Sequence, residues 1–286
     1  MNKQKGKSGQ IHSLKSKLVR GIISMVLVLY TGIALFVLGF TVLNSFKQKA
    51  ELVTNLFGWP HKFVLDSYKT VFADGSIFRN FGNSLLLTLG GTALCVFLAS
   101  MVAYGISRYD FKGKGALTAY FLIGMMVPMQ VTVLPLFLIF QKLHLLNTLT
   151  GMILLYGSGI SLSMFIFSRF FKTISKALEE SAKLDGANDF TIYTRIILPV
   201  CKPVIFTVAL IVSVGYWNDF YLPMILLSKK AKYTLTLVIF NYLGQFVKRM
   251  DVSFAAVVIT LVPVILLYCF FSNQMVEGIT GGAVKE

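Results

Sequence analysis

Long apolar blocks alternate with shorter polar segments along most of this chain. A helix that crosses the hydrocarbon core of a membrane needs about 20 mostly apolar residues. Six blocks meet this requirement, at residues 22–44, 84–107, 117–140, 149–171, 203–227 and 254–271. The pattern therefore predicts an all-α integral membrane protein with six transmembrane helices.

Helix-breaking and small residues are distributed unevenly among these blocks. The third block contains Pro128 and Pro135, and each proline removes a backbone hydrogen bond, so we expect a kink or a break there. The second block contains Gly90, Gly91 and several alanines. Small residues let helix backbones approach each other closely in lipid. The sequence thus predicts a bent third span and close packing along the second.

Lysine and arginine residues orient the predicted spans, because cytoplasmic loops carry an excess of them. Most lie in the terminal segments, in the loop 108–115 and in the segment 169–202. Six spans place all of these on one side, so both termini are predicted to be cytoplasmic. The expected divisions are a basic tail over 1–20, a transmembrane domain over 21–272 and a C-terminal tail over 273–286. The other side has fewer basic residues, mostly in the two longer loops, and the main departure from the rule is the basic cluster Lys229, Lys230 and Lys232 left outside.

Composition narrows the class of protein and its ligands. Hydrophobic residues make up 56% of the 286, and the mean hydropathy is +0.73, which fits a bilayer as solvent. The net charge of +15 also fits nucleic-acid binding, but basic residues beside apolar spans more simply hold a protein against an anionic leaflet. We expect membrane lipid and no nucleic acid among the partners. The three cysteines lack CxxC spacing and the histidines are isolated, so no metal site is predicted.

A polar segment between the fourth and fifth blocks has the features of two short helices joined by a turn. Ser175 can cap the first helix, and Gly186 can end it because glycine adopts the left-handed conformation at little cost. Asn188 or Asp189 can cap the second helix, which Pro199 is expected to end.

The charges of this segment allow two interpretations. Opposite charges four residues apart favour pairs of Lys176 with Glu180 and of Glu179 with Lys183. Such a charge run is typical of a solvated amphipathic loop lying on lipid headgroups. Two short helices with a compact corner also form a knob that fits a cleft in a soluble partner.

The spacing within this segment matches a known pattern. The matching residues form two groups. The first is Glu180-x-Ala182-x-x-Asp185-Gly186-Ala187, and the second, at the matching distance further along the chain, is Ile196-x-Leu198-Pro199. This pattern closely resembles the signature of the permease subunits of bacterial ABC importers. The chain departs from it at Ser181, where alanine is usual, and at Ser175, where proline often stands.

The resemblance extends over nearly the whole chain. It includes Pro128 and Pro135, the run Trp217-Asn218-Asp219-Phe220 with Pro223, and the residues 278–285. These features look like the carbohydrate-uptake branch of the family, and specifically like its maltose-permease-like second membrane subunit.

The resemblance implies a function and a set of partners. The chain would be a multi-pass permease of the cell (cytoplasmic or inner) membrane that imports a sugar or oligosaccharide by alternating access. Partner ATPases would bind and hydrolyse ATP, so neither enzyme activity nor a cofactor is expected in this chain. The implied partners are a second permease subunit forming a heterodimer, two ATPase subunits, and an extracellular or periplasmic solute-binding protein that faces residues 228–251.

The resemblance also assigns roles to residues. The segment 175–199 would be the coupling helix region that docks in a groove of the ATPase, where Glu180 would pair with a basic group and Gly186 would give the sharp turn. The residues assigned to coupling are Glu180, Ala182, Asp185, Gly186, Ala187, Ile196, Leu198 and Pro199.

Asp219 is the single acid within an apolar block, and an acid in lipid is a functional candidate by default. The position of Asp219 fits equally well an acid at the end of a helix or one that makes a polar contact between helices. The candidate translocation pathway consists of Gln130, Trp217, Asn218 and Asp219. The alternative is a secondary carrier or membrane enzyme that uses Asp219 as a proton or substrate site, and a membrane scaffold is a third hypothesis.

Overall fold

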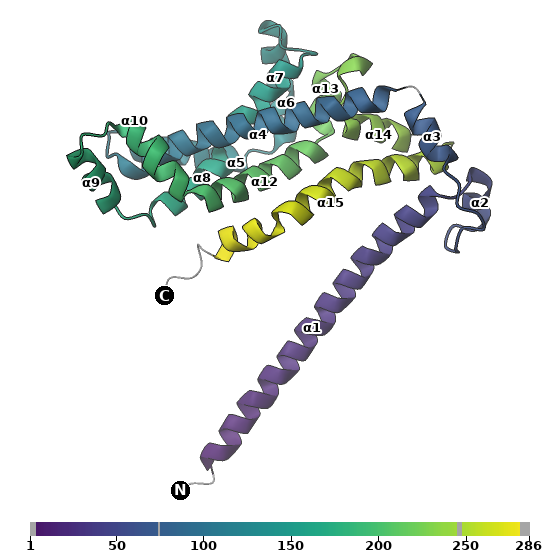
Figure 1. Ribbon diagram of the computed structural model, residues 1–286, viewed down its shortest axis with the longest axis horizontal. Coiled ribbons are helices and arrows are strands. Elements are labelled where there is room, and N and C mark those ends of the chain that lie inside the picture. The colour runs from purple at the N-terminus through teal and green to yellow at the C-terminus, as the bar shows by residue number, and fades with distance from the viewer. Residues whose placement is uncertain (1–3, 74, 245–247, 281–286) are drawn as a thin grey trace. The chain divides into compact units, whose positions relative to one another are not determined.

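The computed structural model describes residues 4–73, 75–244 and 248–280, and every regular element in these ranges is a helix (Figure 1). The all-α class predicted from the sequence is therefore confirmed for them. The outer ends of the two predicted tails, residues 1–3 and 281–286, lie outside the described residues.

The chain divides into two units, residues 1–71 with 245–258 and residues 72–244 with 259–286. The longer elements are α1 (Gln4–Ser45), α4 (Ser76–Arg108), α5 (Lys114–Met126), α6 (Met129–Lys142), α7 (Leu149–Ser158), α8 (Ser161–Phe171), α12 (Lys202–Asn218) and α15 (Met250–Thr280). The shorter ones are α2 (Lys49–Thr54), α3 (Asp66–Phe72), α9 (Ala177–Leu184), α10 (Asp189–Thr191), the π-helix η1 (Ile192–Ile197), α11 (Leu198–Val200), α13 (Tyr221–Leu226), η2 (Lys230–Lys232) and α14 (Leu235–Leu243).

In the first unit, a buried lysine organises the turn after α1. The Lys47 ammonium donates to the carbonyl oxygens of Asn55, Leu56 and Gly58 at 2.7, 3.2 and 2.7 Å. These carbonyl dipoles replace water around the buried cation. Helix α1 begins at Gln4, so the predicted basic tail continues without a break into the apolar block. From residue 17 onward, most apolar side chains of α1 are exposed, as they are on a helix that faces lipid.

In the second unit, α4 is the central helix and packs against α7, α8 and α12. Glycine allows α4 and α7 to approach closely. A Cβ atom on Gly91 would lie 2.7 Å from the Cβ atom of Tyr156, and one on Gly157 would overlap the side chain of Leu94. The close packing predicted from the small residues of the second block is confirmed.

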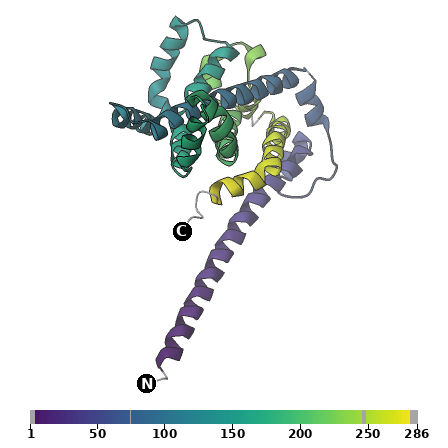
Figure 2. The same ribbon diagram turned by 60° about the vertical axis from the view of Figure 1, so that its left-hand side comes forward.

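The third apolar block forms two helices. α5 and α6 meet at an angle of 105° (Figure 2). The ring of Pro128 restricts the preceding Val127 to extended backbone, with φ −78° and ψ 118°, and the helix cannot continue. α6 then begins at Met129 and contains Pro135. The break predicted from the prolines is confirmed.

The fourth and fifth blocks are also interrupted. α7 and α8 are bent by 42° where they meet at residues 159–160. The fifth block was expected to be one span, but α12 ends at Asn218 and the short helix α13 follows. The break falls at Asp219, whose backbone is extended (φ −68°, ψ 122°).

The number of membrane spans is not fixed by helix length. Among the described residues, Val19–Ser45 of α1 and the whole of α4 are each long and apolar enough to cross a membrane, and counting each bent pair as one span raises the total to five. A further apolar helix, Met250–Leu266, is shorter. The count of six stays a prediction.

Replacing Gly157 with valine should destabilise the packing of α4 on α7. The added side chain overlaps Leu94, and overpacking of this kind costs about 1–3 kcal/mol. Thermal unfolding in detergent measures the loss. Gly105→Ala on α4 is the control, because a Cβ atom there meets nothing within 4 Å; equal unfolding temperatures for the two variants would contradict the packing.

Candidate functional site

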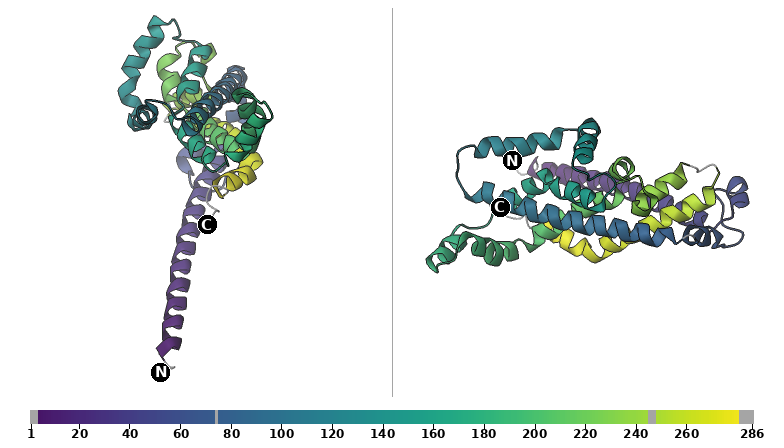
Figure 3. Two further views of the ribbon diagram at one scale, coloured as in Figure 1. Left: turned by 90° about the vertical axis from the view of Figure 1, so that its left-hand side faces the viewer. Right: turned by 90° about the horizontal axis from the view of Figure 1, so that it is seen from above.

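The polar segment 175–199 forms a projection at the end of the second unit where α4 terminates (Figures 1 and 3); we call it the polar projection. Its first helix, α9, begins at Ala177, whose N–H donates to the Ser175 hydroxyl at 3.3 Å. The helix N-cap is Lys176, so the predicted cap lies one residue too early. Ser175 still satisfies a free N–H at the helix start.

Gly186 ends α9 as predicted. Its φ is +83°, its N–H donates to the carbonyl of Lys183, and the N–H of Ala187 donates to that of Ala182, both at 3.0 Å. This pair of bonds is a Schellman motif, which satisfies the last carbonyls of a helix and needs a left-handed residue. Glycine adopts that conformation without a Cβ penalty.

The second helix of the projection starts as predicted and ends differently. The Asn188 side chain accepts the Thr191 N–H at 2.8 Å and caps α10. Pro199 was expected to end this helix, but it lies inside α11, and the chain turns only at Cys201 before α12. Proline is tolerated in the first turn of a helix, where its missing N–H has no intrahelical partner.

Charge contacts close the corner of the projection. The Lys183 ammonium lies 3.2 Å from an Asp189 carboxylate oxygen. The Tyr109 hydroxyl and this ammonium both donate to Asp189 and hold the pKa of its carboxyl below the ordinary value. Lys183 was expected to pair with Glu179, so that expectation is wrong: the Schellman turn brings Asp189 closer.

The eight residues predicted for coupling divide into two groups by exposure. Those on the surface are Glu180, Asp185, Gly186 and Pro199. Those that pack into the hydrophobic core are Ala182, Ala187, Ile196 and Leu198. The first group is available to a partner, and the second attaches the projection to the core.

Large apolar side chains also lie on the surface of the projection. Leu184 is 90% exposed, Phe190 66% and Leu178 46%. Exposed large apolar residues are available to a partner protein.

Glu179, absent from the predicted site, is buried and forms an ion pair with Arg108 at the end of α4. Adjacent residues of a helix point about 100° apart, so Glu179 faces the core while Glu180 faces outward. Two adjacent acids at the start of a helix were the one local signal, and the sequence does not say which of them faces inward.

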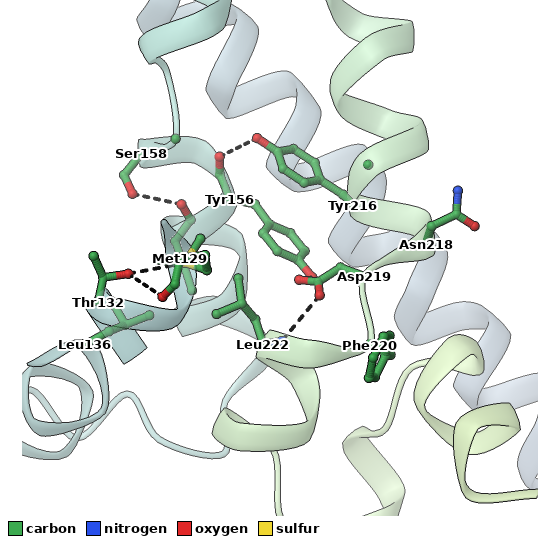
Figure 4. A pocket seen from close by; sticks show the side chains of 13 residues that line it. Met129, Thr132, Leu136, Tyr156, Ser158, Tyr216, Asn218, Asp219, Phe220 and Leu222 are labelled. Atoms are coloured by element: carbon green, nitrogen blue, oxygen red, sulfur yellow. Dashed lines mark hydrogen bonds between the residues drawn. The ribbon is translucent and has the colours of Figure 1, made fainter. Parts of the chain in front are cut away.

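A cavity of about 680 Å³ lies where the broken helices meet (Figure 4). Its walls come from α6, α7, α12 and α13 and the breaks between them. The lining residues are Met129, Thr132, Leu136, Leu155, Tyr156, Ser158, Gly159, Gly215, Tyr216, Asn218, Asp219, Phe220 and Leu222.

Asp219 is held on several sides at the edge of this cavity. The Tyr156 hydroxyl donates to Oδ2 at 2.9 Å, and the N–H groups of Tyr221 and Leu222 donate to Oδ1 at 2.9 and 3.3 Å. The Tyr216 ring stacks on Tyr156 at 4.3 Å, and its hydroxyl donates to the Tyr156 carbonyl at 2.6 Å. Asp219 thus lies at the end of α12, and its carboxylate accepts the first two N–H groups of α13. A position at a helix end is one of the interpretations that the sequence left open.

The cavity contains half of the predicted pathway residues. Asn218 and Asp219 line it. Trp217 is buried elsewhere, in edge-to-face contact with Phe81, and Gln130 is exposed on α6 outside the lining. Tyr156, Thr132 and Ser158 line it without having been predicted, because they come from other spans and lie in apolar runs that resemble ordinary packing.

Two loops are joined at the opposite end of the second unit. The Asn147 side chain accepts N–H groups from Ser228 and Lys229 at 3.2 and 3.1 Å, and the Lys232 ammonium donates to the Asn147 carbonyl at 2.6 Å. Asn147 has a φ of 57°, a conformation that asparagine tolerates better than most residues.

We call the residues 142–149 and 226–236 the cationic loop pair, because they include four lysines and no acid. From α4, the Asn83 side chain donates to the carbonyls of Ala231 and Tyr233, each at 3.0 Å. The Ser84 hydroxyl accepts the Leu235 N–H at 2.8 Å. The backbone that carries the lysines is therefore firmly held.

Among the residues that the structure describes, no group of three or more potential metal ligands comes together.

Residues 95–277 match the family of binding-protein-dependent transport system inner membrane components. The chain is 35% identical over 244 residues, 85% of its length and 89% of the relative's, to the probable starch degradation products transport system permease protein AmyC of Thermoanaerobacterium thermosulfurigenes. It is 34% identical over 278 residues, 96% of its length and 99% of the relative's, to the arabinooligosaccharides transport system permease protein AraQ of Bacillus subtilis.

The fold is similar to that of solved transporters. A chain from the crystal structure of a bacterial ABC transporter involved in the import of the acidic polysaccharide alginate matches with a TM-score of 0.79 and 22% identity, covering 90% of this chain and 97% of that one. A chain of the alginate transporter in complex with an alginate pentasaccharide-bound periplasmic protein matches with a TM-score of 0.61 and 18% identity, over 96% and 99%. At these identities the likeness concerns the fold alone.

Replacing Tyr156 with phenylalanine should destabilise the protein by about 1–3 kcal/mol, because a hydrogen bond to a partly buried carboxylate is lost while the ring remains. Thermal unfolding in detergent measures the change. Tyr120→Phe is the control, since this ring is exposed and surface changes stay within about 0.5 kcal/mol. An unchanged Tyr156→Phe unfolding temperature would show that Asp219 does not depend on this bond.

Proposed function

This chain belongs to the family of binding-protein-dependent transport system inner membrane components, and from that premise we propose that it is the permease subunit of an ATP-driven importer for a sugar or oligosaccharide. The substrate class is supported by the names of its relatives, which specify starch degradation products and arabinooligosaccharides. As an inner membrane component, the protein is a multi-pass protein of the cell membrane.

The polar projection is the observation that carries this proposal. It presents Glu180 and the apolar residue Leu184 at the surface, while Ala182 and Ile197 beneath them pack into the core. A short helix that is packed on the core and has a mixed polar and apolar outer face can bind in a groove of a soluble partner. We assign it as the coupling helix that docks in an ATPase subunit.

The proposed assembly contains this chain, a second and different permease subunit, two ATPase subunits and a solute-binding protein. ATP is bound by the ATPases, so this chain needs no cofactor and catalyses no reaction. When the ATPases close on ATP, they push the two coupling helices together, and the permease changes from inward-facing to outward-facing.

The arrangement of loops supports the predicted topology of six spans with both termini in the cytoplasm. The loop after α4 contacts the polar projection, where Tyr109 donates to Asp189. The loops before α7 and after α13 contact each other through Asn147 and Ser228. Successive loops of the second unit therefore alternate between two ends, as the loops of a chain crossing a membrane repeatedly must. The projection then lies in the cytoplasm and the cationic loop pair outside.

We assign the cavity between the broken helices to the translocation pathway. Its volume of about 680 Å³ is in the range of small-molecule sites, roughly 300–1,000 Å³. Thr132, Ser158 and Asn218 supply hydroxyl and amide groups suited to sugar hydroxyls, and Phe220 supplies an aromatic surface. Irregular backbone at membrane depth is tolerated where it lines a water-filled space.

The cationic loop pair is the proposed contact for the solute-binding protein. Its lysines lie on backbone fixed by Asn83, Ser84 and Asn147, so little ordering is needed on binding. A positive patch recruits a partner with an acidic patch and speeds their association.

A secondary carrier based on Asp219 is the alternative. Both oxygens of its carboxylate already accept hydrogen bonds, which suits a structural cap at least as well as a proton site. Transport by the purified chain without an ATPase, or transport that collapses with the proton gradient, would favour the carrier.

Gly186→Pro and Glu180→Lys should each reduce ATP-driven uptake to background while membrane insertion persists. Proline cannot adopt the φ of +83° at this turn, and a lysine reverses the charge offered to the ATPase. Uptake and solute-stimulated ATPase activity of the reconstituted complex measure the effect. Asp66→Lys on α3 is the control for charge reversal at an exposed acid. Full stimulated ATPase activity in both variants would refute the coupling assignment.

Reversing two charges in the cationic loop pair, with Lys229→Glu and Lys230→Glu together, should slow association with the binding protein by about tenfold at low salt. The difference should shrink as salt rises, because screening weakens exposed charges. Surface plasmon resonance at several salt concentrations measures both effects. The double reversal Lys112→Glu with Lys176→Glu, at the other end of the unit, is the control; the same association rate for both double variants would refute the assignment.

A further inference from the structure

A buried ion pair joins the last residue of α4 to the polar projection. The Arg108 Nε atom lies 2.6 Å from the Glu179 Oε1 atom, and the two side chains are only 5% and 12% exposed. The N–H bond is not aligned with this oxygen, so the contact is one of charge rather than an aligned hydrogen bond.

Further contacts fix both partners. The Arg108 Nη2 group donates to the carbonyl of Ile174 at 3.1 Å, just before α9. The Tyr104 hydroxyl, one turn earlier on α4, donates to Glu179 Oε2 at 3.4 Å. The Tyr104 ring packs edge-on against Phe171 at 6.0 Å and tilted against Tyr193 at 5.2 Å. The last turn of α4 thus holds α9 and the segments on both sides of it.

The stability of the fold does not by itself explain why Arg108 and Glu179 form a buried ion pair. Removing two charges from water offsets much of their attraction, and replacing a buried pair by apolar residues of similar volume is often neutral or stabilising. A charged pair differs from apolar packing because it joins two specific groups. It therefore fixes one point of α9 against one point of α4. The hydrophobic effect between apolar side chains is non-directional.

The ion pair between Arg108 and Glu179 lies directly behind the acid proposed to contact the ATPase. Glu180 lies on the outer face of α9 and Glu179 on its inner face. Glu179 and Arg108 thus connect α9, which carries Glu180 on its outer face, to the last residue of α4. α4 continues unbroken for 33 residues, whereas the other apolar blocks of the unit that pack on it are bent.

We propose that Arg108 and Glu179 are positioning residues that convert displacement of α9 into displacement of α4, so that ATP hydrolysis is coupled to solute movement. This inference rests on the proposed function. It predicts that loss of the pair leaves an assembled complex that hydrolyses ATP with little transport.

Two variants of the reconstituted importer test this proposal. Glu179→Gln keeps the shape and removes the charge. The double variant R108M/E179L removes both charges, so no unpaired charge stays buried, a replacement that is often neutral or stabilising. The measurements are recovery of ATPase subunits with the permease, ATP-driven uptake, and the number of ATP molecules hydrolysed per solute imported. Asp110→Asn is the control, because it breaks an exposed ion pair with Lys114 just beyond α4.

We expect both variants to retain the ATPase subunits and to raise the ATP used per solute by roughly twofold to thirtyfold, the range of a residue on a coupling route. Asp110→Asn should match the wild type. If both variants hydrolyse as many ATP molecules per imported solute as the wild type, the inference is overturned and the proposed function stays intact. Loss of the ATPase subunits from both variants would make the pair a structural support only and would also overturn it. Absence of ATP-dependent uptake by the wild-type complex would refute the proposed function, and the inference with it.

Discussion

The packing of α4 is the constraint on which the rest of the second unit depends. Near its start, Asn83 and Ser84 hold the cationic loop pair. At its middle, Gly91 allows the approach of Tyr156, whose hydroxyl in turn holds Asp219. At its last residue, Arg108 holds the polar projection. One unbroken helix therefore sets the positions of the two end surfaces and of the cavity between them.

Much of the local structure could be predicted from the sequence. Gly186 ends a helix and Asn188 caps the next because these properties belong to a residue and its immediate neighbours. The break at Pro128 follows in the same way from the restriction on the residue before a proline. Pro199 shows the limit of such rules. The same residue that stops one helix is tolerated in the first turn of another, and tertiary packing decides which occurs.

The contacts that define the site were beyond local reasoning. Tyr104 and Glu179 are 75 residues apart in sequence, and Tyr156 and Asp219 are 63 apart. A tyrosine in an apolar block looks like packing until its hydroxyl meets a carboxylate from another helix. Exposure adds a second ambiguity, since the Glu179–Glu180 pair does not reveal which acid faces the core. A family signature selects Glu180, and the fold adds Glu179.

Continuous and broken helices have different mechanical properties, and their distribution here suits alternating access. A continuous helix carries a displacement from one end to the other, because each turn is fixed to the next by backbone hydrogen bonds. A break such as that at Gly159 or Asp219 absorbs rotation in a few dihedral angles, as hinge residues do. α4 connects the two end surfaces without a break, while the cavity is bounded by the bend between α7 and α8 and by the interruption between α12 and α13. Under the proposed mechanism, displacement of α4 at the polar projection reaches the opposite loops, and the change in shape is concentrated where the helices are interrupted, around the cavity through which we propose the solute passes.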